Sequence, residues 1–189
     1  AKLITFAGPM VMPNFSKEIS IYTEENFWRM IISNKNPGMI KFPKINKLSL
    51  ISPNEASGKI VGGNLAVFTS LLGTRYIPNL KNKILFLEDI SEPPYKIDRM
   101  FNQLKLNNAF KKAKGIILGR FEDCKEADEK KNTLTLEEVW SDYLGNIKIP
   151  AIHSFPHGHI KDMVTLPIGI RIRLNAAKGY LEFLESVVT

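Results

Sequence analysis

"KILFLED", residues 83–89, is the stretch of sequence that decides the fold. It runs through four consecutive apolar residues and ends in two carboxylates. A segment that is apolar at every position predicts a strand buried on both faces, as in parallel sheets covered by helices. An amphipathic helix with proline at its start is predicted over 94–110, and a second buried strand, "GIILG", over 115–119. The order strand, helix, strand indicates an α/β fold with a parallel core.

Further strands and helices are predicted on both sides of this unit. "GKIVGGN", 58–64, predicts a short strand ending in a Gly-Gly turn, and "LAVFTSLLG", 65–73, a helix with Asn64 as its N-cap. Thr135 and Glu138 form a capping-box pattern. The remaining elements that we expect are a strand over 2–6, a helix over 23–34 capped by Thr23, a half-buried strand over 45–52, an exposed charged loop over 122–133, a helix over 135–145, a strand over 149–155, and a C-terminal β-hairpin of 168–175 and 180–185.

Composition and charge exclude several classes of protein. With 44% hydrophobic and 24% charged residues among 189, the chain has a globular composition, and its single cysteine, Cys124, allows no internal disulfide. No apolar run approaches the roughly 20 residues that span a bilayer. The net charge is +7, but the lysines are scattered apart from a cluster at 111–114, so we expect neither a nucleic-acid nor a membrane partner. Because the chain starts without Met, we expect it to be part of a longer protein.

Two carboxylates stand where a site could form. Glu88 and Asp89 end a buried strand, and ligands of open α/β sheets gather at the carboxyl ends of strands. A polar residue held there can orient another group, although the pair could equally cap the segment that follows. Glu92 is a competitor, but it suits the loop or the first turn of the next helix, where the helix dipole favours a negative charge.

The three histidines of the chain lie in or beside "SFPHGHIKDMVTLPIG", residues 154–169. The spacing of His153, His157 and His159 invites a zinc site. However, the H-E-x-x-H pattern is absent, and proline and glycine make this stretch a loop, so we expect no metal and no cofactor. Two interpretations remain open, a general base on a loop or polar loop histidines without a catalytic role.

A histidine base needs a nucleophile, and the chain offers no clear one. The G-x-S-x-G pattern of a nucleophile elbow is absent. Ser57 falls in a predicted turn and Ser70 inside a predicted helix, and neither position suits an activated serine. The residues therefore provide an acid and a base without a nucleophile, which agrees with a missing upstream part.

Two long segments carry a resemblance to a known family. "IVGGNLAVFTSLLGTRYIPNLKNKILFLEDISEPPYKIDRMFNQL", 60–104, and "FPHGHIKDMVTLPIGIRIRLN", 155–175, strongly resemble the LD-carboxypeptidases, serine peptidases of the muramoyltetrapeptide carboxypeptidase type. "ITFAGPMV", 4–11, resembles the segment that joins their two domains. The resemblance extends from about Leu3 to the final hairpin.

The resemblance implies a domain organisation and a set of site residues. Residues 1–22 would be the linker and first strand that join a missing N-terminal Rossmann-like domain, and 23–189 the C-terminal catalytic-support domain, a swivelling-type β/β/α domain. Glu88 and His159 would complete a Ser-His-Glu triad whose serine lies before Ala1, and His153 and His157 would be bystanders. Apart from the resemblance, we expect Gly63 and Asn64 to bind substrate, because this turn opens a helix whose N-terminus would favour a substrate carboxylate.

The resemblance also implies the activity and the partners. The enzyme would remove the terminal D-alanine from murein tetrapeptides in the cytoplasm during cell-wall recycling, without a cofactor, as a homodimer whose chains carry the N-terminal domain. Two alternatives stay open. One is a microcin-type self-immunity peptidase that cleaves an aminoacyl-nucleotide antibiotic, and the other is a non-catalytic binding module that uses the histidines as a metal or partner site.

Overall fold

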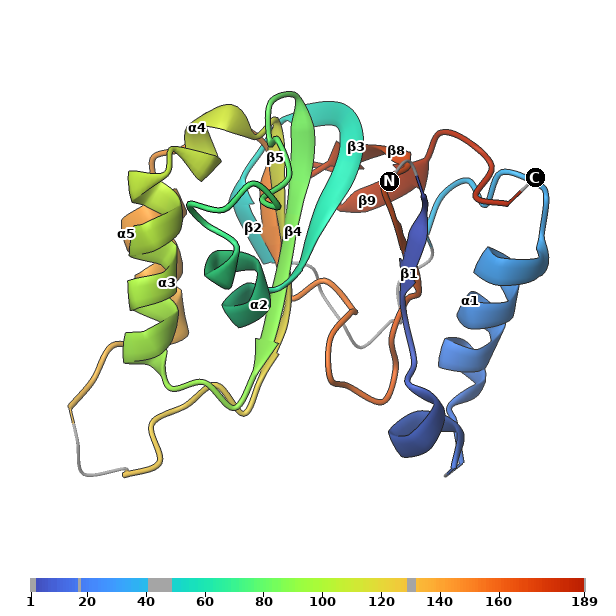
Figure 1. The fold of residues 1–189 in the computed structure, drawn as a ribbon, viewed down its shortest axis with the longest axis horizontal. Helices are drawn as coiled ribbons and strands as arrows, with labels where there is room; N and C mark the ends of the chain where they lie inside the picture. The colour runs from blue at the N-terminus through green and yellow to red at the C-terminus, as the bar shows by residue number, and fades with distance from the viewer. Residues whose placement is uncertain (1–2, 17, 41–48, 129–131, 189) are drawn as a thin grey trace.

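A seven-stranded mixed sheet forms the centre of the molecule (Figure 1). The computed structural model describes residues 3–16, 18–40, 49–128 and 132–188. The strand order is β2-β6-β5-β4-β3-β8-β9; β6, β5, β4 and β3 are parallel, and β2, β8 and β9 are antiparallel to their neighbours. The predicted α/β class, parallel core and terminal hairpin are thereby confirmed. The strands are β2 (Ser49–Ser52), β3 (Glu55–Asn64), β4 (Lys83–Ile90), β5 (Gly115–Glu122), β6 (Ala151–His153), β8 (Arg171–Asn175) and β9 (Tyr180–Phe183).

Different layers cover the two faces of this sheet (Figure 1). Within the ranges that the structure describes, one face carries four helices, and the other carries a helix, a π-helix and a two-stranded antiparallel sheet. Among the described residues, no helix is long and apolar enough to cross a membrane. The first layer consists of α2 (Leu65–Ser70), α3 (Pro94–Leu106), α4 (Ala109–Lys112) and α5 (Leu136–Leu144), and the second of β1 (Thr5–Ala7), η1 (Val11–Phe15), α1 (Ile21–Ile32) and β7 (Leu166–Ile168).

Strand β4 contributes side chains to both hydrophobic cores. Leu85 and Leu87 belong to the core under α2, α3 and α5, and Ile84 and Phe86 belong to the core under α1, β1 and β7. All four side chains are fully buried. Burying such a side chain contributes about 1.5–3 kcal/mol, so both layers hold this strand in place. This double burial explains why residues 84–87 are all apolar.

The helix starts were predicted with mixed success. Asn64 caps α2 by accepting a hydrogen bond from the Val67 amide, and the capping box at the start of α5 is present, so both predictions are confirmed. The prediction that Thr23 caps α1 is wrong. Ser20 is the cap, and Thr23 lies buried in the first turn, where its hydroxyl donates to the Lys161 carbonyl at 2.7 Å.

The predicted Gly62–Gly63 turn is also wrong, because β3 continues through both glycines. Its pairing with β4 extends from Lys59 to Asn64. At Gly62, with a φ of +135°, an added Cβ would lie 1.7 Å from the Phe86 carbonyl oxygen. Glycine is therefore required here by the close approach of two neighbouring strands.

Several other boundaries differ from the prediction. The helix expected over 94–110 is broken after Leu106, because Asn108 adopts a left-handed conformation with a φ of +59°. The described part of the charged segment over 122–133 is largely exposed, but Cys124 within it is buried. Residues 2, 45–48 and 129–131 of the predicted elements lie outside the described residues.

Candidate active site

The carboxyl end of β4 sends its two acidic side chains to opposite faces of the sheet. Side chains alternate along a strand, so Glu88 follows Phe86 toward the layer of β1 and β7, and Asp89 follows Leu87 toward the helices. Asp89 accepts hydrogen bonds from Asn64 Nδ2 at 2.8 Å and from the Ala66 amide at 3.0 Å. The carboxylate of Asp89 therefore fixes the start of α2.

The loop between β6 and β7 brings His159 to Glu88. Gly158 precedes the histidine with a φ of +136°, a conformation that favours glycine. A Cβ at this position would lie 3.1 Å from the Arg120 carbonyl oxygen and 3.2 Å from Glu88 Oε2. Glycine thus allows the loop to pass close to the carboxylate and present the next imidazole.

Glu88 and His159 form a hydrogen-bonded pair although 71 positions separate them. His159 Nδ1 lies 3.1 Å from Glu88 Oε2, and a carboxylate at this distance favours the tautomer that donates from Nδ1. Nε2 then carries the lone pair, and no hydrogen bond to it is found within the described part of the chain. The His159 side chain is 33% exposed and that of Glu88 is 8% exposed. The pair can therefore act as a base that is oriented from behind.

Burial strengthens the attraction between the Glu88 carboxylate and a positive charge on the neighbouring imidazole. Desolvation raises the pKa of Glu88 above its ordinary value, and the neighbouring His159 opposes this rise through charge and hydrogen bonding. A buried carboxylate lacks the water that would otherwise stabilise it, so a positive charge forming on the imidazole would be strongly favoured beside it.

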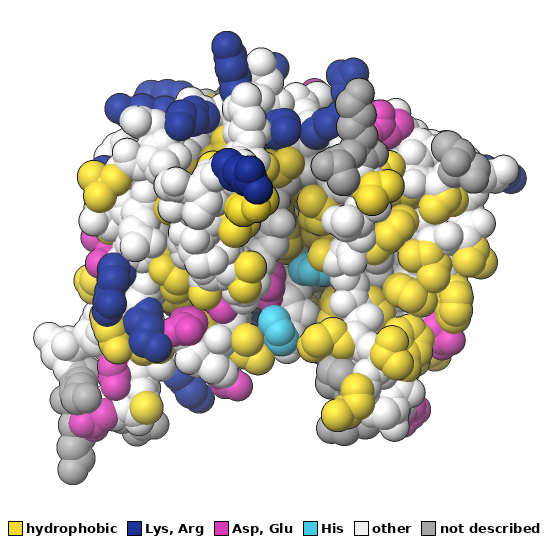
Figure 2. Space-filling view, in the orientation of Figure 1, with side chains coloured by type: hydrophobic (Ala, Val, Ile, Leu, Met, Phe, Trp, Pro, Cys, Tyr) yellow, Lys and Arg dark blue, Asp and Glu magenta, His cyan; other side chains and the backbone are white. Residues whose placement is uncertain are grey.

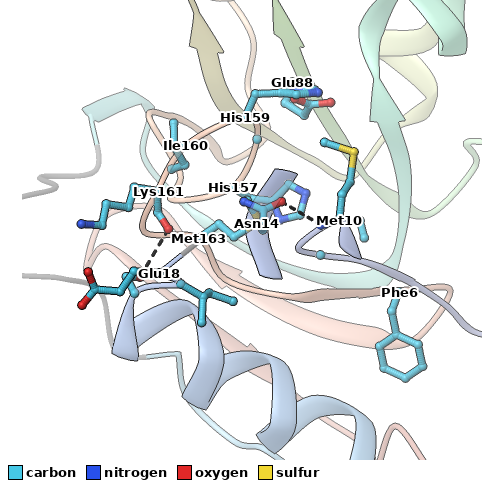
Figure 3. A pocket seen from close by; sticks show the side chains of 15 residues that line it. Phe6, Met10, Asn14, Glu18, Glu88, His157, His159, Ile160, Lys161 and Met163 are labelled. Atoms are coloured by element: carbon cyan, nitrogen blue, oxygen red, sulfur yellow. Dashed lines mark hydrogen bonds and ion pairs between the residues drawn. The ribbon is translucent and has the colours of Figure 1, made fainter. Parts of the chain in front are cut away.

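The pair lies at a cleft of about 560 Å³ between two segments far apart in the sequence. Residues 157–161 and Met163 form one wall with Glu88, and described residues between Phe6 and Ser20 form the other. Figure 2 shows histidine side chains in a hollow between the helical layer and the layer of β1 and α1. In Figure 3, Glu88 and His159 lie next to each other, whereas Phe6 and Glu18 lie farther off. This second wall was not predicted, because residues 1–22 were expected to form a linker and a first strand.

The other residues singled out in the sequence have structural contacts of their own. Gly63 and Asn64 do not line the cleft, and Asn64 is occupied by Val67 and Asp89, so their contact with substrate stays a prediction. Glu92 pairs with Lys96 at 3.0 Å. Neither Ser57 nor Ser70 lines the cleft; Ser57 pairs with β8 in the sheet, and Ser70 Oγ donates to a carbonyl of its own helix.

The remaining histidines are held differently from His159. Burial lowers the pKa of His153, whose Nδ1 lies 3.1 Å from Ser154 Oγ. His157 is almost fully buried, and burial lowers its pKa to about 4. Across the described ranges, no group of three His, Cys, Asp or Glu side chains is placed to hold a metal ion.

Comparison with known proteins identifies the family of this chain. A family profile described as "LD-carboxypeptidase C-terminal domain" matches residues 57–174. A probable murein peptide carboxypeptidase of Bacillus subtilis is 34% identical over 177 residues, which cover 93% of this chain and 54% of that protein. The microcin C7 self-immunity protein MccF of Escherichia coli is 31% identical over 214 aligned residues, which cover 99% of this chain and 61% of that protein. The chain thus spans between about half and three fifths of the length of these relatives.

Solved structures extend the likeness to the whole described fold. The structure of wild-type MccF without ligand superposes with a TM-score of 0.86 at 26% identity, covering 99% of this chain and 62% of that one. A muramoyltetrapeptide carboxypeptidase from Oxalobacter formigenes superposes with a TM-score of 0.77 at 29% identity, covering 95% and 60%. Sequence and fold agree, and this chain belongs to the LD-carboxypeptidase family, whose C-terminal domain it matches.

Proposed function

We propose that this chain is the part of a serine-type LD-carboxypeptidase that supplies the catalytic base and the carboxylate that orients it. The observation that carries the proposal is the 3.1 Å contact between His159 Nδ1 and Glu88 Oε2 at an open cleft. An exposed imidazole backed by a buried carboxylate is the arrangement that general-base catalysis on a hydroxyl nucleophile requires.

The reaction then follows from the two ring nitrogens of His159. Nε2 takes the proton of the attacking serine hydroxyl, whose oxygen forms a bond to the peptide carbonyl carbon. The carbon–nitrogen bond breaks as Nε2 gives that proton to the leaving amine, and water hydrolyses the acyl-enzyme in a second round. Glu88 keeps Nδ1 protonated throughout and stabilises the imidazolium that forms between the two transfers.

The serine of this proposal lies outside residues 1–189. Within the described lining of the cleft, the only serine is Ser20. Its Oγ accepts a hydrogen bond from the Thr23 amide as the cap of α1. Use as a cap holds this hydroxyl in the start of the helix. The matching family profile is described as a C-terminal domain, and this chain covers 54% of the Bacillus subtilis protein, which together support an upstream domain.

The substrate that we propose is a murein tetrapeptide, from which the terminal D-alanine is released. Support comes from the relatives described as murein peptide and murein tetrapeptide carboxypeptidases, from Bacillus subtilis and Pseudomonas aeruginosa. A second candidate is a microcin-type substrate, because the structural likeness to MccF, with a TM-score of 0.86, is the greater of the two described above. The homodimer and the cytoplasmic location stay predictions.

Release of D-alanine by the full-length protein tests this proposal. We expect Glu88→Gln, which removes the charge and keeps the shape, and His159→Gln to reduce kcat by about 10³-fold or more. Matched controls are Glu137→Gln, at an exposed position on α5, and His153→Gln, outside the cleft. Full activity of either cleft variant would refute the roles assigned to the pair, and cleavage of an aminoacyl-nucleotide in place of the tetrapeptide would establish the second candidate.

A further inference from the structure

A buried hydrogen bond closes the loop that carries His159. His157 Nδ1 lies 2.6 Å from the Val164 carbonyl oxygen, and the Val164 amide donates to the Pro156 carbonyl at 2.7 Å. These two bonds join the ends of a nine-residue segment that contains His159. A hydrogen bond between the two ends of a loop restricts the conformations that the loop can adopt.

The same histidine fastens the loop to the strands beneath it. The His157 carbonyl accepts a hydrogen bond from the Arg120 amide of β5 at 2.8 Å. Its ring packs edge-on against Phe86, with 5.1 Å between ring centroids and an interplanar angle of 82°. Phe86 precedes Glu88 by two positions on the same face of β4, so the ring of His157 packs on the strand that carries the carboxylate partner of His159.

Close packing leaves little freedom for this arrangement to shift. At Gly119 of β5, an added Cβ would lie 2.5 Å from the His157 carbonyl oxygen and 3.0 Å from Glu88 Cβ. The loop backbone, β5 and the Glu88 side chain therefore meet at one point. Misplacement of a catalytic group by about 1 Å can reduce a rate by about 10²-fold, so what holds the loop here affects the chemistry.

The protonation state of His157 suits a supporting role. Burial lowers its pKa to about 4, so the ring is neutral near pH 7. A neutral ring facing a carbonyl oxygen carries its proton on Nδ1, which makes it the donor to Val164. A neutral neighbour also avoids repulsion of the positive charge that the proposed mechanism places on His159.

We propose that His157 is a positioning residue that holds His159 against Glu88 through its hydrogen bond to the Val164 carbonyl. The inference rests on the proposed function for its effect on rate, but the contact itself does not. His157 is only 6% exposed, so it acts through the loop and not on the substrate.

A matched pair of substitutions in the full-length protein tests the proposal. Asn and Leu have nearly the same shape, but only Asn can donate from the position of Nδ1. We expect His157→Asn to keep kcat for D-alanine release within about 3-fold of wild type, and His157→Leu to lose about 10- to 100-fold in kcat with KM little changed. If the Leu variant does not fold, His157→Gln, whose amide lies one bond farther out, replaces it in the comparison.

A spectroscopic measurement separates this proposal from the proposed function. The Nδ1 proton that His159 shares with Glu88 gives a low-field proton resonance, which we expect to persist in His157→Asn and to weaken or disappear in His157→Leu. An inactive wild type with this pattern would refute the proposed function and leave the positioning role standing. Equal kcat and equal resonances in the two variants, or a Leu variant that differs only in thermal stability, would overturn the positioning role.

Discussion

Acid should destabilise this chain through one buried imidazole, that of His157. The pKa of His157 falls from 6.5 to about 4 on burial. Between these values the unfolded chain binds a proton that the folded chain excludes, so the free energy of unfolding decreases as the pH falls from 6.5 toward 4. Each pKa unit corresponds to 1.36 kcal/mol, which gives a full loss of about 3 kcal/mol and a loss of about 2 kcal/mol between pH 7 and pH 5.

Urea unfolding at pH 7 and at pH 5, followed by tryptophan fluorescence, measures this loss. His157→Leu is the reference, because the difference between the two proteins isolates His157 from other groups. His153, whose pKa is also lowered, adds a loss of the same sign, whereas the raised pKa of Glu88 favours the folded state as the pH falls. We expect wild type to lose about 2 kcal/mol more than the variant. Equal losses in the two proteins would refute the assignment of a buried, neutral His157.

Two further predictions concern the close packing of the sheet and its helical layer. Gly62→Ala should prevent folding or lower the free energy of unfolding by more than about 4 kcal/mol, because its Cβ would lie 1.7 Å from the Phe86 carbonyl oxygen. Gly63→Ala, whose Cβ would have no atom within 4 Å, should lower it by about 1–3 kcal/mol through its backbone conformation alone. Similar urea midpoints for the two variants would contradict this prediction. The Cys124 thiol is buried, and burial raises its pKa to about 11. It should therefore react with a disulfide reagent at pH 8 only as fast as the chain opens. Rapid stoichiometric labelling of the folded protein would contradict this prediction, because it would show that the thiol is accessible.

Local patterns were sufficient to predict most of the elements. The apolar run within 83–89 predicted a strand buried on both faces, and Asn64 and Thr135 predicted the starts of α2 and α5, because caps and periodicity act within a few residues. Where the helix start depended on a distant contact, the prediction was wrong. Thr23 resembles a cap in the sequence, but it is buried against the Lys161 carbonyl, and the cap is Ser20.

Contacts between distant segments could not be predicted from spacing. Gly62 resembles a turn residue, and the need for it arises from β4, which the chain reaches about twenty residues later. The wall formed by residues 6–20 has no chemical pattern that identifies it, because it contributes to the cleft through its position opposite His159. Spacing and residue type do not separate His157 from His159. The resemblance assigned only His159 a role, and the contacts of His157 with Val164 and Phe86 become visible only in the fold.

Labelling with a fluorophosphonate tests the central claim that Glu88 and His159 serve a serine outside this chain. The reagent modifies a serine that a neighbouring base has activated, and mass spectrometry of the labelled full-length protein identifies the position. We predict a label on one serine outside residues 1–189, in wild type and in Ser20→Ala alike, and its loss in His159→Ala. A label on Ser20 or on any other serine of residues 1–189, or labelling that persists without His159, would contradict the account.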